Sequence, residues 1–370
     1  MNKKIRVGIV GANPERGWAR LAHIPALSCF SDFELIAVAE PTRERAEKSA
    51  ETFGAALAFS DAQELAHSPD VDLVVVTVRV PDHYPVVMAA LAANKHIYCE
   101  WPLGRTLTET QEMAALSQRT SGVAMIGLQA LSSPAVRRAQ QLVAEGALGT
   151  LLNMRVYSPT AGWATEAPPT YRYLQDRETG ATLATIVGGH TLALMEFIAG
   201  PIADVQAHNS IRFKTIKIKG TNETVERTSP DHMVVIGRHD NGCVSVLEVV
   251  SASPDVFRLE LVGTKGSLVI NGPGAGGFQT GALTLSVTGI AVTGIAVTGS
   301  ELPTTNNANN EIEKLNGPAL NLAHAYSRLG AAIKNGEVLQ PNFKTAENLA
   351  RLLVAVDRAA EEGRRVSVKD

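Results

Sequence analysis

The sequence predicts an α/β domain with a parallel sheet, followed by an α+β domain with an antiparallel sheet. Short β-branched runs alternate with helical stretches over the first 127 residues, which is typical of a parallel sheet covered by helices on both faces. Strands separated by short turns follow, and two long helical patterns close the chain. With 370 residues, each domain has room for its own core. We place the boundary near Gly127, so the expected domains are 1–127 and 128–370, and the C-terminal helices could pack back on the first domain.

Five runs in the first domain are apolar on both faces, as strands between two helical layers must be. These expected strands are Ile5–Val10, Phe33–Ala39, Val71–Val78, His96–Cys99 and Val123–Ile126. Helical patterns fill the gaps, at Arg43–Phe53, Tyr84–Ala93 and Thr108–Gln118. Either Thr106 or Thr108 can cap the last of these helices with its hydroxyl.

The second domain opens with a charged amphipathic helix, Ser132–Glu145, which ends at Gly146. Short turns such as DNG and GTKG separate the strands that follow. The expected strands are Leu151–Tyr157, His232–Arg238, Val244–Val250, Arg258–Val262 and Ser267–Ile270, and the expected helices are Thr191–Ala199, Leu320–Lys334 and Thr345–Glu362. The repeat VTGIAVTGIAVTG, Val287–Gly299, is too short for a solenoid, so we expect a hairpin or a mobile loop there. Asn306–Asn310 has the composition of an exposed connector.

Composition excludes several classes of function. A net charge of −3 gives no electrostatic basis for binding nucleic acid or an anionic membrane, and a small-molecule partner is favoured. Three cysteines in a chain of this size indicate reduced thiols and therefore the cytoplasm. The sequence has no CxxC, HExxH, GxSxG or P-loop pattern, so we expect no metal site, hydrolase triad or nucleotide triphosphate site.

A glycine-containing segment, RVGIVGANPERGWA, follows the first strand and opens a helix. In this setting glycines of a GxGxxG motif hold a pyrophosphate at the helix N-terminus. Here the motif runs from Gly11, Asn13 takes the second position, and the last glycine is delayed by one residue to Gly17. Asparagine tolerates left-handed backbone angles, so we expect Asn13 to make the tight turn. The alternative is a purely structural turn.

Glu40 stands at the end of the second strand, 23 residues after Gly17. A carboxylate there can accept hydrogen bonds from the hydroxyls of an adenosine ribose, and it repels a 2′-phosphate. The sequence therefore predicts NAD rather than NADP, although Arg43 and Arg45 leave room for a phosphate. The alternative is that Glu40 only solvates the strand end.

The segments VGIVGAN, TVRVPDHYPVVMAAL, KHIYCEWPL, IVGGHTLALMEFIAG and LVGTKGSL together resemble the glucose-fructose oxidoreductase and inositol dehydrogenase (Gfo/Idh/MocA) family. The GxNxxxGW loop, the HYxVVM run, EW in place of EK, and GHT are similar to the branch that contains the fungal galactose-pathway repressor. The resemblance implies a Rossmann domain followed by an α+β domain with an open, mainly antiparallel sheet. Such sheets often serve for oligomerisation, so we expect a homodimer or homotetramer.

In typical members of the family, the lysine of an EKP motif touches the nicotinamide ribose and the reacting hydroxyl, and a later histidine assists proton transfer. The matching residues here are Glu100, Trp101 and Pro102, and then His190. An indole cannot act as a base, and Trp101 is better suited to stacking on a sugar or the nicotinamide. We therefore expect His190 to be the acid/base, with a structural histidine at a helix start as the alternative.

Further contacts are expected from the cofactor loop and from the carboxyl edge of the sheet. We assign Trp18, Glu100, Trp101 and His83 to the cofactor, although His83 could instead only cap the helix that begins near Tyr84. The long connection Gly162–Asp176 carries side chains suited to a polyol, either to line its pocket or to pack the domains together: Trp163, Tyr171, Arg172, Tyr173 and Asp176.

Tyr171 or Tyr173 could replace His190 as acid or base. Arg155 is a candidate for an anionic substituent of the substrate, or else a solvated residue on a sheet face.

Three functions fit these expectations. The first is an NAD-dependent oxidoreductase that acts on a hydroxyl of a sugar or sugar derivative, with a carbohydrate as the small-molecule substrate. The second is an NAD-dependent glycoside hydrolase, which oxidises the sugar ring transiently and recycles the cofactor. The third is a non-catalytic regulator that binds NAD and a partner protein, as the repressor branch and Trp101 suggest.

Overall fold

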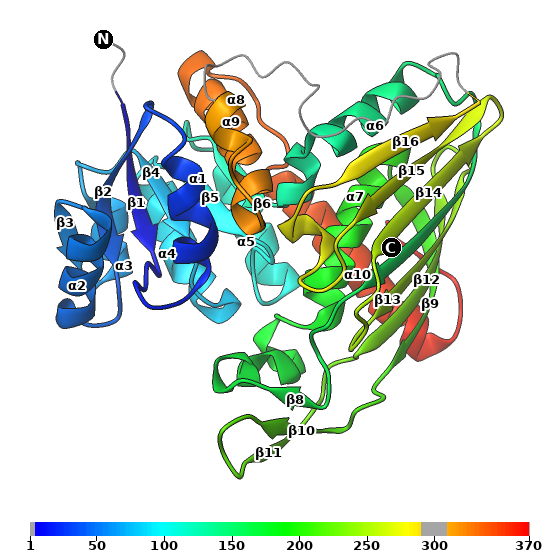
Figure 1. Cartoon of the computed structure of the whole chain (residues 1–370), viewed down its shortest axis with the longest axis horizontal. Helices are drawn as coiled ribbons and strands as arrows, with labels where there is room; N and C mark the ends of the chain where they lie inside the picture. The colour runs from blue at the N-terminus through cyan, green and yellow to red at the C-terminus, as the bar shows by residue number, and fades with distance from the viewer. Residues whose placement is uncertain (1–3, 290–308, 370) are drawn as a thin grey trace. The chain divides into compact units, whose positions relative to one another are not determined.

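The computed structural model describes residues 4–289 and 309–369, which form two compact units (Figure 1). Unit 1 comprises the chain up to Gln129 together with residues 309–347, and unit 2 comprises residues 130–289 and 348–369. The sequence placed the boundary near residue 127. A later segment, with helix α9 (Pro318–Asn335), also belongs to unit 1.

Unit 1 contains a six-stranded parallel sheet in the order β3-β2-β1-β4-β5-β6. The strand order reverses between β1 and β4, and this switch point is where doubly wound sheets bind their ligands. All five expected strands are present, and the additional β3 has only three half-buried residues. The strands are β1 (Ile5–Val10), β2 (Phe33–Ala39), β3 (Leu57–Phe59), β4 (Leu73–Val76), β5 (His96–Glu100) and β6 (Ala124–Gly127).

Threonine side chains cap two helices of unit 1. The Thr42 hydroxyl accepts a hydrogen bond from Arg45 N at the start of α2, and Thr106, not Thr108, caps α5 through Glu109 N. The helices are η1 (Ala19–His23), α1 (Ile24–Leu27), α2 (Arg43–Phe53), α3 (Ala62–His67), η2 (Val80–Asp82), α4 (His83–Ala92), α5 (Leu107–Ser117), η3 (Gln129–Ser132, continuing into unit 2), α8 (Asn309–Ile312) and α9.

Helix α9 completes the core of unit 1. Its fully buried Tyr326 stacks on Tyr98 of β5, with ring centroids 5.5 Å apart, and contacts Phe33 edge-on. Leu322 and Leu329 of the same helix join the cluster that contains Val7 of β1. Burying such side chains contributes roughly 1.5 to 3 kcal/mol each, so α9 is an integral part of this unit.

Unit 2 contains an eight-stranded sheet in the order β16-β15-β14-β7-β13-β12-β9-β17. Every neighbouring pair is antiparallel except β7 with β13, which confirms the expected mainly antiparallel sheet. The strands are β7 (Leu151–Pro159), β9 (Ile202–Ser210), β12 (His232–His239), β13 (Val244–Val250), β14 (Phe257–Gly263), β15 (Gly266–Gly272), β16 (Thr284–Thr288) and β17 (Val366–Ser367).

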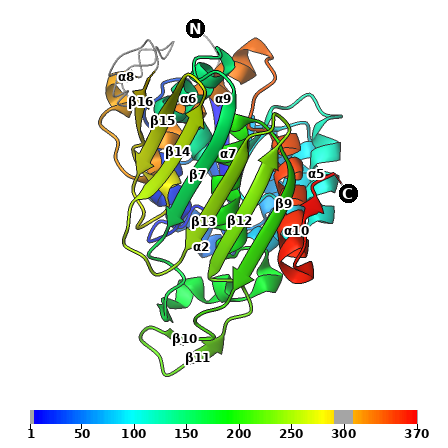
Figure 2. The same cartoon turned by 90° about the vertical axis from the view of Figure 1, so that its right-hand side faces the viewer.

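Helices of unit 2 cover one face of this sheet. Helix α7 (Gly189–Ala199) follows a π-helical turn, η6 (Ala184–Gly188), and its Thr191 hydroxyl lies 2.9 Å from that of Ser158 on β7. Figure 2 looks onto the opposite face, where the strands are in front of the helices. The remaining helices are α6 (Pro134–Ala144), η4 (Pro169–Gln175), η5 (Arg177–Thr179), η7 (Phe278–Thr280) and α10 (Phe343–Glu362, which begins in unit 1).

A second, three-stranded sheet supports the long connection of unit 2. It consists of β8 (Glu166–Ala167), β10 (Thr215–Ile218) and β11 (Thr224–Glu226). Of the repeat Val287–Gly299, the first two residues end β16, and 290–299 lie outside the described residues, as do 306–308 of the expected connector. No helix in the described ranges is long and apolar enough to cross a membrane.

Candidate functional site

The loop after β1 forms its turn with two glycines. Gly11 has φ +91° and Gly17 has φ +104°, a region that side-chain-bearing residues rarely adopt. A Cβ at Gly11 would lie 3.2 Å from Val78 N, so β1 and the loop after β4 approach closely here. Asn13 does not have a positive φ, contrary to our expectation. It acts through its side chain instead, since Asn13 Oδ1 accepts hydrogen bonds from the backbone N–H groups of Glu15 and Arg16 at 2.9 and 3.1 Å.

Two polar groups beside this loop have no hydrogen-bond partner among the described residues. The Trp18 indole N–H is buried at the start of η1 without an acceptor. Glu40 follows β2 with only 7% of its surface exposed, and no described residue donates to its carboxylate. Burial raises the pKa of Glu40, and the nearby charges of Arg45 and Arg16 oppose this shift. A buried donor and a buried acceptor are therefore both available to a ligand.

Glu100, the last residue of β5, accepts hydrogen bonds on both carboxylate oxygens. His23 Nε2 lies 2.9 Å from Oε1, and Gln129 Nε2 donates to Oε2 at 2.7 Å. The other nitrogen of His23 lies 2.7 Å from the Tyr326 hydroxyl, and the His23 side chain is fully buried. The Glu100 network, which comprises Glu100, His23, Tyr326 and Gln129, thus fixes the strand end that immediately precedes Trp101.

Trp101 and His83 lie at the same edge of the sheet. Trp101 is 7% exposed and begins the turn after β5. The ring of His83 is buried, and its nitrogens lie 3.0 Å from the carbonyl oxygens of Pro102 and Val78. Burial lowers the pKa of His83 in spite of these acceptors. His83 therefore ties the turn after β4 to the turn after β5 and does not cap α4, and a direct cofactor contact remains a prediction.

His190 lies in the first turn of α7 with 6% of its surface exposed. Unlike His83, its ring has no hydrogen bond or ion pair with any described residue. Burial lowers the pKa of His190 to about 3, so the ring is neutral at physiological pH, with a free lone pair but with less basicity than an exposed imidazole. The alternative of a hydrogen-bonded structural histidine finds no partner in the described chain.

Hydrogen bonds join the beginning of the connection Gly162–Asp176 to its end. Trp163 has φ +51°, and its indole N–H donates to Leu174 O at 3.2 Å. Arg227 donates to Ala164 O at 2.8 Å and to Gln175 Oε1 at 2.8 and 2.9 Å, and so holds both ends of the segment.

A buried ion pair anchors that arginine. Arg227 and Asp231 are 2.7 Å apart and their side chains are completely buried. The Asp231 carboxylate also accepts the backbone N–H groups of Arg212 and Phe213, each at 2.8 Å. We call Arg227, Asp231 and Gln175 the Arg227 cluster. Sequence analysis did not single out any of its members.

The other residues expected to bind substrate have varied surroundings. Tyr171 is 54% exposed, Tyr173 is half-buried, and Arg172 pairs with the exposed Glu223 at 2.8 Å. The Asp176 carboxylate caps η5 by accepting Glu178 N at 3.0 Å. These contacts hold the connection in place, and contacts to a substrate remain predictions for all four.

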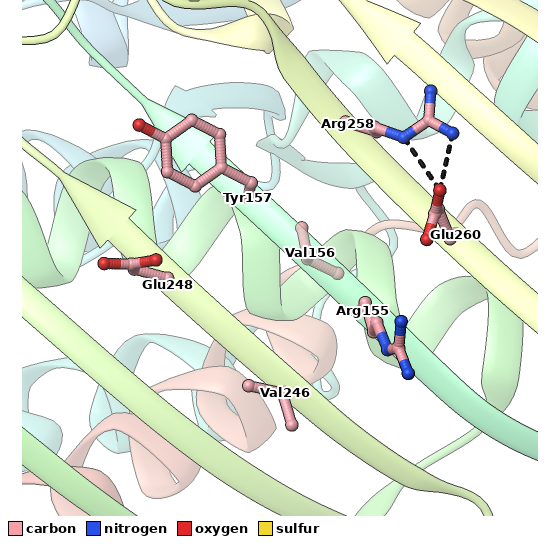
Figure 3. A pocket seen from close by; sticks show the side chains of 7 residues that line it. All are labelled: Arg155, Val156, Tyr157, Val246, Glu248, Arg258 and Glu260. Carbon is pink, nitrogen blue, oxygen red and sulfur yellow. Dashed lines mark hydrogen bonds and ion pairs between the residues drawn. The ribbon is translucent and has the colours of Figure 1, made fainter.

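Arg155 requires a correction. It lies on β7 with its side chain on the exposed face of the eight-stranded sheet, beside Glu260 of β14 in register and near Tyr157 and Arg258 (Figure 3). Ser158 lies three residues further along the same strand, so its side chain is on the other face of the sheet. There it contacts α7, the helix that carries His190. Arg155 and His190 are therefore on opposite faces of the sheet and cannot share one substrate pocket.

Comparison with known proteins agrees with this architecture. The model of the oxidoreductase family with an NAD-binding Rossmann fold (GFO/IDH/MocA) matches residues 5–128, and that of the Gal80p C-terminal domain matches residues 134–272. The galactose/lactose metabolism regulatory protein GAL80 of Kluyveromyces lactis is 30% identical over 78% of this chain and 68% of its own length. The chain belongs to the GFO/IDH/MocA family. Unit 1 is thus the NAD-binding Rossmann domain of the family.

Relatives in the family include named dehydrogenases. Dehydrogenase aclE of Aspergillus oryzae is 30% identical over 74% of this chain and 78% of its own length. A solved levoglucosan dehydrogenase in complex with NADH and L-sorbose has the same fold, with a TM-score of 0.85 at 22% identity over 99% of both chains. The Gal80p structure from Kluyveromyces lactis superposes with a TM-score of 0.82 at 26% identity, over 100% of this chain and 95% of that one.

Family membership bears on the role of Trp101. The resemblance implies a lysine at the position of Trp101. Within the described residues, no group of histidine, cysteine, aspartate and glutamate side chains could hold a metal ion. Hydride chemistry in this chain would therefore need an acid/base other than that lysine.

Proposed function

We propose that this protein is an NAD-dependent oxidoreductase that acts on a hydroxyl of a sugar or sugar derivative. The observation that carries the proposal is His190, a buried and neutral histidine without any hydrogen-bond partner in the described chain. No described group occupies its ring nitrogens, so they are free to meet a ligand. A substrate hydroxyl would supply the missing partner.

The polar groups of unit 1 fit NAD. The left-handed glycines Gly11 and Gly17 allow backbone N–H groups to approach a pyrophosphate, and the unpaired Trp18 N–H can donate to one of its oxygens. The unpaired Glu40 carboxylate can accept from both hydroxyls of the adenosine ribose and would repel the 2′-phosphate of NADP. Bound NAD supplies a hydride acceptor at its nicotinamide ring.

The residues of this chain then have to orient the alcohol and move one proton. His190 accepts the proton of the hydroxyl as its C–H bond breaks, which histidine can do because its neutral ring has a free lone pair. Trp101 offers an apolar face and one N–H, which orient a sugar ring without moving a proton. The connection Gly162–Asp176, held by the Arg227 cluster, supplies the aromatic surface for the rest of the substrate, from Trp163 and Tyr173.

Two other functions fit the same residues. The replacement of the family lysine by Trp101, together with the similarity to GAL80, favours a regulator that binds NAD without turnover. An NAD-dependent glycosidase would use the same His190 to start a transient oxidation, and would release an aglycone without net NADH.

One assay separates the three functions. The purified protein, freed of bound nucleotide, is mixed with NAD and a panel of free sugars, sugar acids and aryl glycosides, while NADH absorbance and aglycone release are followed together. Steady NADH formation that is lost in His190→Ala but kept in Trp101→Phe supports the dehydrogenase. Aglycone release at constant NADH indicates the glycosidase, and tight NAD binding without either signal indicates the regulator.

We further propose that the open face of the eight-stranded sheet pairs copies of this chain in a homodimer or homotetramer. Exposed apolar residues Ile236, Val244 and Val246, each more than 40% exposed, lie there beside alternating charges. Arg155 lies between Val246 and Glu260 in register, and a hollow of about 300 Å³ surrounds it (Figure 3). Light scattering tests the proposal, since a monomer at all concentrations would contradict it, and Val246→Glu should weaken an assembly on this face.

A further inference from the structure

Gln129, the last residue of unit 1, carries a buried oxygen atom that the protein leaves unsatisfied. Only 2% of the residue is exposed. Its side-chain nitrogen donates to Glu100 Oε2 at 2.7 Å, whereas Gln129 Oε1 is buried and has no hydrogen-bond partner in the described chain. An amide needs partners on both atoms, so this oxygen is available to an external donor.

The orientation of this amide is fixed by the Glu100 network. A carboxylate oxygen only accepts hydrogen bonds, so His23 Nε2 and Gln129 Nε2 must both carry hydrogen. In the neutral ring, His23 Nδ1 then accepts from the Tyr326 hydroxyl. If the amide were rotated by 180°, its oxygen would face the carboxylate. Gln129 Oε1 therefore points away from Glu100.

The packing around Glu100 leaves little freedom for the network to rearrange. A Cβ at Gly127, the last residue of β6, would lie 2.9 Å from Glu100 Oε2 and 3.0 Å from Glu100 Cα. Only glycine allows β6 to approach β5 this closely. The network is thus held by the two strands that it joins as well as by its hydrogen bonds.

The position of Gln129 in the sheet identifies the donor. A dinucleotide lies across the switch point with one nucleotide on each half of the sheet, and Glu40 after β2 marks the adenosine half. Gln129 follows β6 in the other half, which receives the nicotinamide nucleotide. The only N–H donor on the nicotinamide base is the amino group of its carboxamide.

We propose that Gln129 Oε1 accepts a hydrogen bond from the carboxamide amino group of NAD, and that the Glu100 network positions Gln129 for this contact. The inference rests on the NAD binding proposed above. It adds a residue that fixes the orientation of the nicotinamide ring and so determines which face of the ring is presented to a substrate. Gln129 is a positioning residue here and takes no part in proton transfer.

The test compares two dinucleotides. In 3-acetylpyridine adenine dinucleotide a methyl group replaces the carboxamide amino group, and the adenosine, pyrophosphate and ribose groups are unchanged. Affinities of the two for the nucleotide-free protein are measured by calorimetry, without any turnover. We expect the native protein to prefer NAD by about tenfold, which corresponds to one hydrogen bond. In Gln129→Met the preference should fall to about one, and in the exposed control Gln118→Met it should stay near tenfold.

The outcomes separate this inference from the proposed function. If the native protein binds NAD but binds both dinucleotides equally, the inference is overturned, whether or not any variant folds. A tenfold preference that persists in a folded Gln129→Met also overturns it, because another group must then accept the carboxamide hydrogen. If the native protein binds neither dinucleotide, the NAD-dependent function and this inference fail together.

Discussion

His83 in unit 1 and His190 in unit 2 are both almost inaccessible to solvent, at 1% and 6% exposure, yet the surroundings of their rings are opposite. His83 directs its nitrogens at backbone carbonyl oxygens, and His190 has no partner in the described chain. The first arrangement stabilises two turns. The second leaves the ring free to meet a ligand. Burial alone therefore does not distinguish a structural histidine from a functional one.

The sharpest test of this difference is removal of each ring. His190→Asn should lower turnover by about 10² to 10⁴-fold, because the base is lost, without lowering the melting temperature. His83→Asn should instead destabilise the fold by roughly 1 to 3 kcal/mol, because buried carbonyl groups lose their donor. NADH formation and thermal unfolding are measured for both variants. If His190→Asn keeps its activity, His190 is not the acid/base and the proposed difference between the two histidines is wrong.

The same reasoning extends to charge. In unit 2 the Asp231 carboxylate is completely paired, so Asp231→Ala should lower the free energy of unfolding by about 3 to 5 kcal/mol by stranding buried Arg227. The matched control is Asp240→Ala, whose exposed contact with Lys369 at 3.7 Å should contribute less than about 1 kcal/mol. Urea unfolding measures both, and equal effects would show that burial of the pair is unimportant.

In unit 1 the Glu40 carboxylate is buried but unpaired, like His190, and removing it should affect binding more than stability. Glu40→Gln should weaken NAD about tenfold or more, since hydrogen bonds to a charged acceptor contribute roughly 1.5 to 3 kcal/mol. Affinity for NADP should fall less or rise, because the repulsion of the 2′-phosphate is removed. Calorimetry with both dinucleotides measures these affinities. If the affinity for NAD is unchanged, Glu40 does not bind the cofactor and only solvates the end of β2.

A pH series gives the finest comparison. Burial lowers the pKa of His190 to about 3, against about 6.5 in an unfolded chain, so below pH 6.5 the unfolded state binds a proton that the folded state does not. This contribution to stability is complete above pH 6.5 and is lost as the pH falls. Between pH 7 and pH 5 the native protein should lose about 2 kcal/mol more than His190→Asn does. As a control, the exposed variant His67→Asn should lose stability with falling pH as the native protein does. If the stability of His190→Asn falls with pH as steeply as that of the native protein, the burial effect is contradicted.

The sequence predicted the long elements of both sheets because their patterns are local. Strands buried on both faces are continuous apolar runs, and β1 and β2 were predicted with the observed bounds. Strands of two or three residues, such as β3 and β17, are too short for any period to register. The second half of β9 is polar and half-exposed, and so lacks the apolar alternation that marks a strand.

The site residues divide in a similar way. Gly17 and Glu40 could be predicted as cofactor contacts because each prediction depends only on the position of the residue after a strand. Gln129 also follows a strand, β6. A glutamine in a sequence does not indicate a binding site, however, and only the structure shows that its side-chain oxygen has no partner. Arg227 and Gln175 are 52 residues apart, and His23 and Tyr326 are 303 apart, so no spacing in the sequence indicates that these side chains meet.

Helix α9 has a consequence for the order of folding. Its Tyr326 completes the core of unit 1 against Tyr98, yet the whole of residues 130–289 is translated between the two. At synthesis rates of roughly 5 to 20 residues per second, the first unit waits on the order of 10 to 40 seconds for its last helix. During that interval the apolar surface around Phe33 and Tyr98 lacks the cover that α9 gives it. Chaperone binding to nascent chains of this protein should therefore be strongest before residue 335 leaves the ribosome, and should fall once α9 is released.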